Sequence, residues 1–268
     1  MSQTSSPPRT QSADPAPTHP LVNLRDLGGI RVSTGRLRPQ RLWRADDPSL
    51  SPAPEIRSLA EQGLTAVLDL RSTGEVAASP HSRAAELGLR HHHLPLAETA
   101  VHPLALVRAA PEVKSPADVG RWYASLVRSH LHEVVDALRL IGQADGGVLF
   151  HCAAGKDRTG ILAAVVLTLL GVDRAEVVAD YAATEQNLPA IFTRLRLAPY
   201  SKPGTADNDD ARRAAEFFSS GHPLLGAEAD SMDSMLTELG GEPGLLDLIA
   251  SQAEPDSVVG ALHRRLVD

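Results

Sequence analysis

A single cysteine and an arginine six positions after it stand in the segment HCAAGKDRTG, which spans residues 151–160. The apolar residues before this segment predict a strand and those after it a helix. The thiol of Cys152 is therefore expected near the positive end of that helix, where it can ionise at neutral pH. The planar guanidinium of Arg158 can bind two oxygens of one phosphate group. This spacing favours attack on a phosphate ester, with Cys152 as the nucleophile and Arg158 as the phosphate clamp.

The rest of the segment is suited to an anion site. A strand that leads through a short loop into a helix directs several backbone N–H groups at one point. The Thr159 hydroxyl can donate to the sulfur, the Lys156 ammonium adds a positive charge at the rim, and His151 supports the loop from behind. The residues expected to contact the substrate in this loop are Ala153, Ala154, Gly155, Lys156 and Thr159.

Cleavage of a phosphate ester also needs a proton for the leaving oxygen, and a carboxyl group commonly supplies it. Asp157 lies inside the loop. Asp69 ends an apolar run beside Arg71, at the carboxyl end of an expected strand, where sites of α/β proteins gather. We prefer Asp157 as the general acid. Asp69 remains the alternative acid, and Asp69 and Arg71 are candidate substrate-binding residues.

Hydrophobic periodicity predicts alternating helices and strands around this loop. One amphipathic helix is expected from Val119 to about Gly142, because apolar residues recur there at helical spacing. The remaining elements indicate a layered α/β domain. We expect strands over residues 65–70, within 90–96 and over 147–150, and helices over 52–62, 159–170 and 173–186.

Several polar side chains outside the loop are assigned to structural roles. Consecutive residues on a strand point to alternate faces, so the histidines at 91–93 are not expected to share a metal ion. Ion pairs or turn caps are expected from Arg25 with Asp26 and from Arg44 with Asp46. Packing and solvent-facing roles are expected for Tyr181, Thr184 and Glu185.

Composition limits the classes of partner. Of the 268 residues 43% are hydrophobic, enough for a full core, and the formal charge of −7 favours neither nucleic acid nor an anionic surface. A lone cysteine cannot form an intramolecular disulfide, which suits the cytoplasm. The longest apolar stretch, 161–172, is shorter than the roughly 20 residues that cross a bilayer, so no integral membrane association is expected.

The chain is expected to consist of a tail and one catalytic domain. Residues 1–20 are rich in Ser, Pro and Thr and lack the apolar core of a signal peptide, which predicts a disordered tail. Residues 21–268 are expected to form a single domain, with 189–240 as a candidate helical lid or insertion. Within it, residues 199–221 are polar and interrupted by Pro and Gly, with a short helix expected over 211–218.

Three further motifs accompany the cysteine loop: NLRDLGG at 23–29, LWRAD at 42–46 and VLDLRSTGE at 67–75. Together they resemble the protein tyrosine phosphatase superfamily over residues 21–188. The loop itself is most similar to those of bacterial tyrosine, dual-specificity and phosphoinositide phosphatases. Family members of this kind lack a mobile Trp-Pro-Asp acid loop, and this sequence contains no such tripeptide, which supports Asp157 as the acid.

The resemblance implies a fold and an activity. The expected fold is a central, mostly parallel sheet flanked by helices, with extra C-terminal helices. The expected reaction is hydrolysis of phosphotyrosine, and also of phosphoserine or phosphothreonine, through a phosphocysteine intermediate without metal or cofactor.

Two other functions stay open. In a phosphoinositide phosphatase, Lys156 would bind a neighbouring phosphate of the head group. A binding module would use the loop without turnover. The expected partner is thus a phosphorylated protein or a phosphoinositide, and the sequence carries no signal that fixes an oligomeric state.

Overall fold

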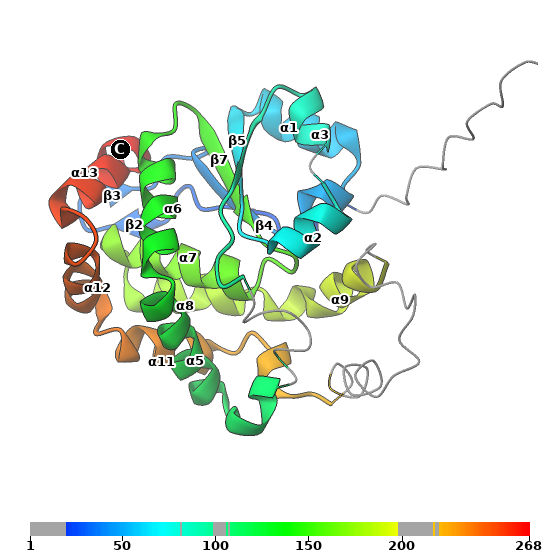
Figure 1. Ribbon diagram of the computed structural model, residues 1–268. Helices are drawn as coiled ribbons and strands as arrows, with labels where there is room; N and C mark the ends of the chain where they lie inside the picture. Colours follow the sequence, from blue (N-terminus) through cyan, green and yellow to red (C-terminus); the bar gives the residue numbers. More distant parts are fainter. Residues whose placement is uncertain (1–19, 81, 99–105, 107, 198–216, 218–219) are drawn as a thin grey trace, which may run out of the picture.

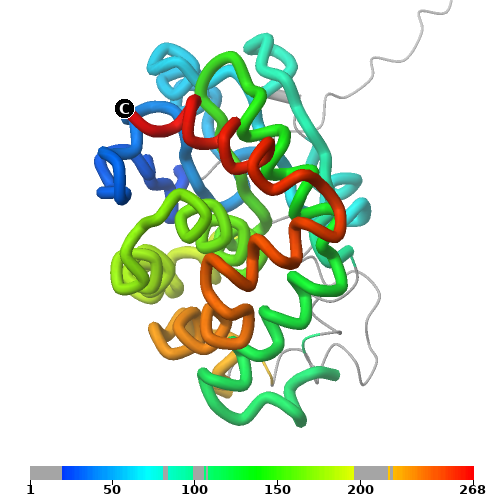
Figure 2. The backbone as a smooth tube through the Cα atoms, turned by 90° about the vertical axis from the view of Figure 1, so that its left-hand side faces the viewer, coloured from blue at the N-terminus to red at the C-terminus, as the bar shows by residue number. Residues whose placement is uncertain are grey.

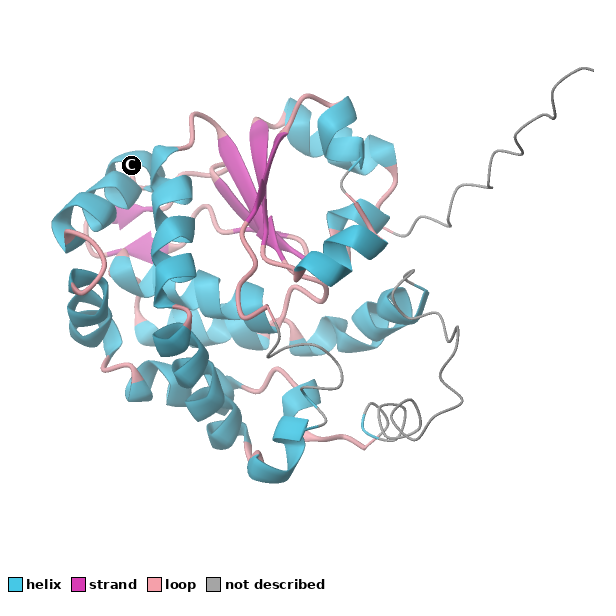
Figure 3. Ribbon diagram, in the orientation of Figure 1, coloured by secondary structure: helices cyan, strands magenta, loops and turns pink. Residues whose placement is uncertain are grey.

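The computed structural model describes residues 20–80, 82–98, 106, 108–197, 217 and 220–268. Its centre is a five-stranded sheet, drawn in magenta in Figure 3, with the order β1-β4-β7-β5-β6. The strands are β1 (Arg25–Asp26), β4 (Leu42–Ala45), β5 (Leu64–Asp69), β6 (Arg90–His93) and β7 (Gly147–His151). β4, β7, β5 and β6 pair in parallel, and only the edge pair β1–β4 is antiparallel. The mostly parallel sheet is confirmed.

The central strands send alternate side chains into two apolar layers. On β7, Val148 and Phe150 enter a large cluster, whereas Leu149 enters a smaller one on the opposite face. On β5, Leu68 and Val67 divide in the same way. Because side chains on a strand point alternately to its two faces, a continuous apolar run buries both faces of the sheet.

Helices cover both faces (Figure 1). The smaller cluster is covered by α1 (Ala53–Glu61) and α3 (Ser82–Glu86), through residues such as Ile56 and Ala84. The first helix after β5 in the chain is α2 (Thr73–Ala78). The larger cluster includes residues of α5 (Pro116–Ser129), α6 (Leu131–Gln143), α7 (Asp157–Leu169) and α8 (Arg174–Ala182).

The single helix expected between Val119 and Gly142 is in fact two. α5 ends and α6 begins at His130, whose backbone is not helical (φ −121°, ψ 33°). α5 packs against α11 (Ala229–Glu238), and α6 packs against α13 (Pro255–Leu266). Both segments keep an apolar stripe toward the core, so the periodicity continues across the break and hides it.

The extra C-terminal helices are α11, α12 (Gly241–Ala250) and α13. Figure 2 shows α13 in red beside α6 in green. After α13, Val267 bridges Leu37, next to the small hairpin of β2 (Arg31–Val32) and β3 (Gly35–Arg36). The chain end is thereby fixed to the N-terminal part of the fold.

The candidate lid, 189–240, is described only in part. It contains α9 (Leu188–Leu197), the short 3-10 helix η5 (Pro223–Leu225) and α11. Met232 and Met235 of α11 are fully buried in the large cluster, so this helix belongs to the core. The predicted tail (except Pro20) and residues 199–219 (except Phe217) lie outside the described residues. Of the helix expected over 211–218, the structure therefore describes Phe217 alone, which is helical and buried.

Within the described ranges, no helix combines the length and the apolar character needed to cross a membrane.

Candidate active site

Three parallel strands end level with one another and place the site at one edge of the sheet. In the register, His151 at the end of β7 pairs with Ala45 at the end of β4 and with Asp69 at the end of β5. Cys152 follows directly and is 2% exposed. The carboxyl edge of parallel strands is where sites form in α/β proteins, as predicted for this loop.

The loop from Cys152 to Lys156 turns its carbonyl groups outward. Each carbonyl from 152 to 155 meets a donor of the surrounding scaffold. The contacts are His151 Nδ1 with Cys152 O (2.9 Å), Asp47 N with Ala153 O (3.1 Å), Asn23 Nδ2 with Ala154 O (3.3 Å) and Arg44 Nη2 with Gly155 O (2.9 Å). Because the N–H and C=O of a trans peptide point in opposite directions, the following amides face the inside of the loop. This is the arrangement that binds an anion.

Gly155 is required for this loop. Its φ is +67°, and a Cβ atom there would lie 2.5 Å from the carbonyl oxygen of Ala45. Any other residue would strain the backbone and collide with the end of β4.

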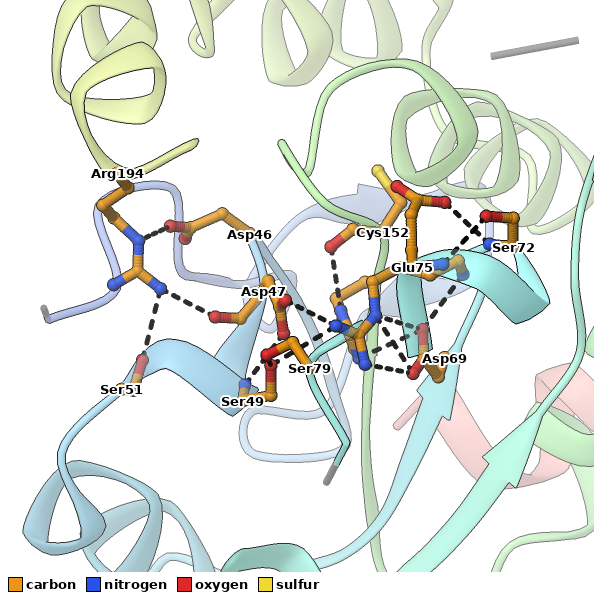
Figure 4. A network of polar contacts seen from close by, with 12 residues as sticks. Asp46, Asp47, Ser49, Ser51, Asp69, Ser72, Glu75, Ser79, Cys152 and Arg194 are labelled. Atoms are coloured by element: carbon orange, nitrogen blue, oxygen red, sulfur yellow. Dashed lines mark hydrogen bonds and ion pairs between the residues drawn. The ribbon is translucent and has the colours of Figure 1, made fainter. Parts of the chain in front are cut away.

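Arg158 lies in the first turn of α7 and forms a two-pronged ion pair with Glu75 of α2. Arg158 Nη1 lies 2.7 Å from Glu75 Oε2, and Nη2 lies 2.9 Å from Oε1. Ser72 holds the same carboxylate through a capping box (Figure 4). Burial raises the pKa of Glu75, but the hydrogen bonds and charge of Arg158 outweigh it and bring that pKa to about 2. Conversely, burial lowers the pKa of Arg158, and the bonds to Glu75 more than reverse this.

Two buried donors in this first turn have no hydrogen-bond partner among the residues that the structure describes. These donors are Nε of Arg158 and Oγ1 of Thr159. Arg158 is 4% exposed and Thr159 is 0% exposed. Buried donors are nearly always satisfied in folded proteins. Next to a loop that directs its amides inward, these two donors are suited to a bound anion and to the sulfur of Cys152.

Asp69 lies beneath the loop, surrounded by basic groups. Its carboxylate binds Arg71 Nη2 at 2.7 Å and His91 Nε2 at 3.3 Å, and His151 Nε2 lies 3.6 Å away. Arg71 also binds Asp47 at 2.5 Å. Asp69 and Arg71 are both 0% exposed. Asp69 and Arg71 are bound to one another and to Asp47 and His91, which favours a role in supporting the loop over the expected substrate contact.

Asp157 begins α7 in a different environment. Its side chain is 17% exposed, so the carboxyl group reaches the surface at the loop. Tyr123 of α5 donates to its Oδ1 at 2.5 Å, and Lys156 Nζ lies 3.1 Å from the same oxygen. The preferred acid is therefore held by neighbours but is still accessible.

Lys156 does not lie at the rim, where it was expected. It is 3% exposed, and its ammonium donates to Leu224 O at 2.6 Å and Gly226 O at 3.0 Å. The chain around η5 covers it and supplies these acceptors. With Asp157, the three N–H bonds of the ammonium have three acceptors.

This chain is similar to known phosphatases along most of its length. The family described as "Tyrosine phosphatase family" matches residues 16–247. A tyrosine-protein phosphatase of Cupriavidus necator is 34% identical over 194 residues, which cover 69% of this chain and 68% of that protein. The chain belongs to the tyrosine phosphatase family.

A second relative of this phosphatase is the triple specificity protein phosphatase PtpB of Mycobacterium tuberculosis. The two are 28% identical in an alignment 270 positions long, which covers 90% of this chain and 96% of that protein. The crystal structure of TpbA from P. aeruginosa is 18% identical, covers 78% of this chain and 96% of its own, and has a TM-score of 0.34. The family match and the two relatives confirm the predicted family and the enzyme class of protein-tyrosine phosphatases.

The scaffold of this phosphatase uses ion pairs other than those expected. Arg25 and Arg44 both bind Asp180 of α8. Asp46 binds Arg194 of α9 at 2.8 Å, and Figure 4 shows this pair. Burial raises the pKa of Asp180, but Arg44 and Arg25 outweigh it and lower that pKa. For Asp46 burial dominates and raises the pKa to about 6. The expected structural roles hold for Arg44 and Asp46, with different partners.

Two of the histidines at 91–93 have structural partners. His91 and His93 lie on one face of β6 with ring centroids 6.4 Å apart. His91 contacts Asp69, and His93 Nε2 lies 2.9 Å from Arg71 O.

Sequence reasoning assigned no role at the site to Glu75, Tyr123 or Tyr181. The packing role expected for Tyr181 is confirmed by its burial in the large cluster, but its hydroxyl bond was not foreseen. Tyr181 is 1% exposed, and its hydroxyl lies 2.9 Å from that of Tyr123. Only Glu75 has a local signal, because Ser72 and Glu75 form the S-x-x-E capping box that marks a helix start. The tyrosines come from helices far apart in the sequence.

Proposed function

We propose that this phosphatase hydrolyses phosphotyrosine monoesters through a phosphocysteine formed at Cys152. The observation that carries the proposal is the pair of unpartnered buried donors, Arg158 Nε and Thr159 Oγ1, beside the single cysteine of the chain. They belong to a loop whose amides face inward. An anion bound there would satisfy Arg158 and lie against the sulfur.

The first step forms the phosphoenzyme. The Cys152 thiolate attacks phosphorus, an S–P bond forms and the P–O bond to the tyrosine oxygen breaks. The leaving oxygen takes the bond pair and receives the proton of Asp157, which becomes a carboxylate. Arg158 and the loop amides bind the non-bridging oxygens, whose charge they stabilise in the transition state.

The second step regenerates the enzyme. The Asp157 carboxylate takes a proton from water as the water oxygen attacks phosphorus. The S–P bond breaks, and Cys152 leaves as a thiolate, which Thr159 can stabilise through its hydroxyl. The products are tyrosine and inorganic phosphate, and Asp157 carries its proton again.

The position of Lys156 favours phosphotyrosine over a phosphoinositide. Its ammonium is occupied by Leu224 O, Gly226 O and Asp157, so it has no N–H bond left for a second phosphate. The name of the M. tuberculosis relative includes triple specificity, and we include phosphoserine and phosphothreonine as further substrates on that basis.

The catalytic unit is proposed to comprise residues 21–268 as one domain. A cytoplasmic location is proposed from the single cysteine, since a reactive thiolate is kept reduced there.

The test is turnover of p-nitrophenyl phosphate, a phosphotyrosine peptide and a panel of phosphoinositides, without added metal, by the wild type and by Cys152→Ser. Turnover of the first two substrates that the substitution abolishes is the expected result. Equal turnover by both proteins would overturn the mechanism, and turnover restricted to phosphoinositides would overturn the substrate. Lys156→Ala adds a control, because a loss confined to lipid substrates would return Lys156 to a role in reading a second phosphate.

A further inference from the structure

Two buried tyrosines next to the site have no part in the mechanism above. Tyr123 comes from α5 and Tyr181 from α8, and they are 0% and 1% exposed. Their rings meet edge to face, with centroids 6.0 Å apart at 80°. Together with Asp157 they form a chain of hydroxyl and carboxyl groups that joins three helices.

The direction of the hydrogen bonds in this chain is fixed. A carboxylate can only accept, so the one hydroxyl proton of Tyr123 goes to Asp157 Oδ1. The proton between the two phenols must then come from Tyr181. Burial, with the nearby charge of Asp157, raises the pKa of Tyr123 well above its usual range, so this donor keeps its proton at any working pH.

A glycine in the first turn of α7 leaves space for the hydrogen-bonded tyrosines. A Cβ atom at Gly160 would lie 2.8 Å from Cδ2 of the Tyr181 ring. The glycine therefore lets the ring pack against the helix that carries Asp157. From that position the Tyr181 hydroxyl reaches Tyr123.

Both lone pairs of one carboxyl oxygen are used. Oδ1 of Asp157 accepts from Tyr123 and lies 3.1 Å from the Lys156 ammonium, itself fixed by Leu224 O and Gly226 O. A proton on Oδ1 would displace one of these donors. Oδ2 is the oxygen that remains for the acidic proton.

We propose that Tyr123, supported by Tyr181, is a positioning residue that fixes the Asp157 carboxyl so that Oδ2 delivers the proton to the leaving oxygen. The inference rests on the proposed role of Asp157. Tyr123 neither gains nor loses a proton in the reaction. The O–H bond that breaks is that of Asp157, and the new O–H bond forms on the leaving group.

The test is the dependence of the rate on the leaving group. A poor leaving group such as phenol needs the acid, whereas 2,4-dinitrophenol departs as an anion without it. The quantity compared is kcat/KM, which reports the first step alone and leaves out the second step, in which Asp157 acts as the base for every substrate. For Tyr123→Phe we expect kcat/KM with phenyl phosphate to fall ~10- to 100-fold, because the hydrogen bond that orients the acid is lost. The value of kcat/KM with 2,4-dinitrophenyl phosphate and the inhibition by orthovanadate should hardly change. Tyr181→Phe should show a weaker loss of the same kind, because it removes only the second bond of the chain.

The matched control is Trp122→Phe. It changes a ring whose centroid lies 5.5 Å from that of the Tyr123 ring and leaves both tyrosine hydroxyls in place. It should affect both aryl phosphates equally. If Tyr123→Phe also lowers both rates equally, or lowers neither, the positioning role is wrong. Should Tyr123→Phe fail to fold, Tyr181→Phe decides by the same criterion.

Asp157→Asn separates this inference from the proposed function. A leaving-group-dependent loss in Asp157→Asn without one in Tyr123→Phe rejects the positioning role alone. No leaving-group dependence in Asp157→Asn rejects the acid itself. In the double variant, Tyr123→Phe should cause no further loss, because its effect acts through the carboxyl.

Discussion

Two carboxylates lie at the same edge of the sheet, and their neighbours give them different roles. Asp69, at the end of β5, is fully buried between Arg71 and His91, with His151 close by. Asp157, at the start of α7, is partly exposed and is held through one oxygen by a phenol and an ammonium. A carboxylate that is fully buried and bound by its neighbours has no open oxygen for a leaving group. One that is partly exposed at the loop can reach a bound substrate.

The largest effect is expected for Asp157→Asn, which tests whether Asp157 is the general acid. Loss of the general acid should lower kcat for phosphotyrosine ~10²- to 10⁴-fold. The fold should be kept, because the amide oxygen can still accept from Tyr123. Steady-state kinetics measure the fall in kcat, and urea unfolding checks that the fold is kept. An unchanged kcat would transfer the acid role away from Asp157.

The matching change in the other carboxylate is Asp69→Asn. Here we expect a loss of ~2–3 kcal/mol in the free energy of unfolding, because Arg71 keeps Asp47 but loses its charged hydrogen bonds to a second buried carboxylate. Turnover per folded molecule should fall much less than in Asp157→Asn. A leaving-group-dependent loss of kcat in an otherwise stable Asp69→Asn protein would reverse the two roles.

A third carboxylate, Glu75, should make the free energy of unfolding depend on pH. Its pKa of about 2 lies below the ordinary 4.5, so its stabilisation is complete above about pH 4.5 and is lost as the pH falls toward 2. The part lost is ~3 kcal/mol, since one pKa unit corresponds to about 1.4 kcal/mol. Glu75→Gln should be less stable at pH 7 and should lose this part of the acid dependence. Urea unfolding between about pH 6 and about pH 3 measures it, and parallel curves for the two proteins would speak against the ion pair.

The smallest effect is expected at the outer partner of Asp69. The His91 side chain is 26% exposed, and its contact with Asp69 is 3.3 Å long. His91→Gln should cost less than ~1 kcal/mol of stability, as is usual for partly solvated pairs, and should leave kcat unchanged. A fall in kcat comparable to that of Asp157→Asn would connect Asp69 to the chemistry after all.

The part of this site that the sequence could predict is contiguous. Cys152, Asp157 and Arg158 stand in one segment between a strand and a helix, and local periodicity shows both elements. The layered α/β arrangement followed from the alternating helices and strands, and the mostly parallel sheet was implied by the resemblance to the phosphatase superfamily. By contrast, Glu75 meets Arg158 across 83 positions and Tyr123 meets Tyr181 across 58. Such contacts depend on how the helices pack, which no local pattern reports.

Two other differences have the same origin. The break at His130 arises because α5 and α6 pack on different C-terminal helices, while the apolar stripe continues through it. Lys156 is buried because the chain around η5, 68 positions away, supplies Leu224 O as an acceptor. In both cases tertiary packing decided what local sequence left open.

The most direct test of the central claim is to trap the intermediate. The enzyme is mixed with p-nitrophenyl phosphate, quenched in acid within its first turnovers and digested, and the peptide that contains Cys152 is weighed by mass spectrometry. The account predicts that this peptide gains the mass of one phosphoryl group in the wild type and gains none in Cys152→Ser. Turnover with an unmodified Cys152 peptide and the phosphoryl group on another residue would contradict it.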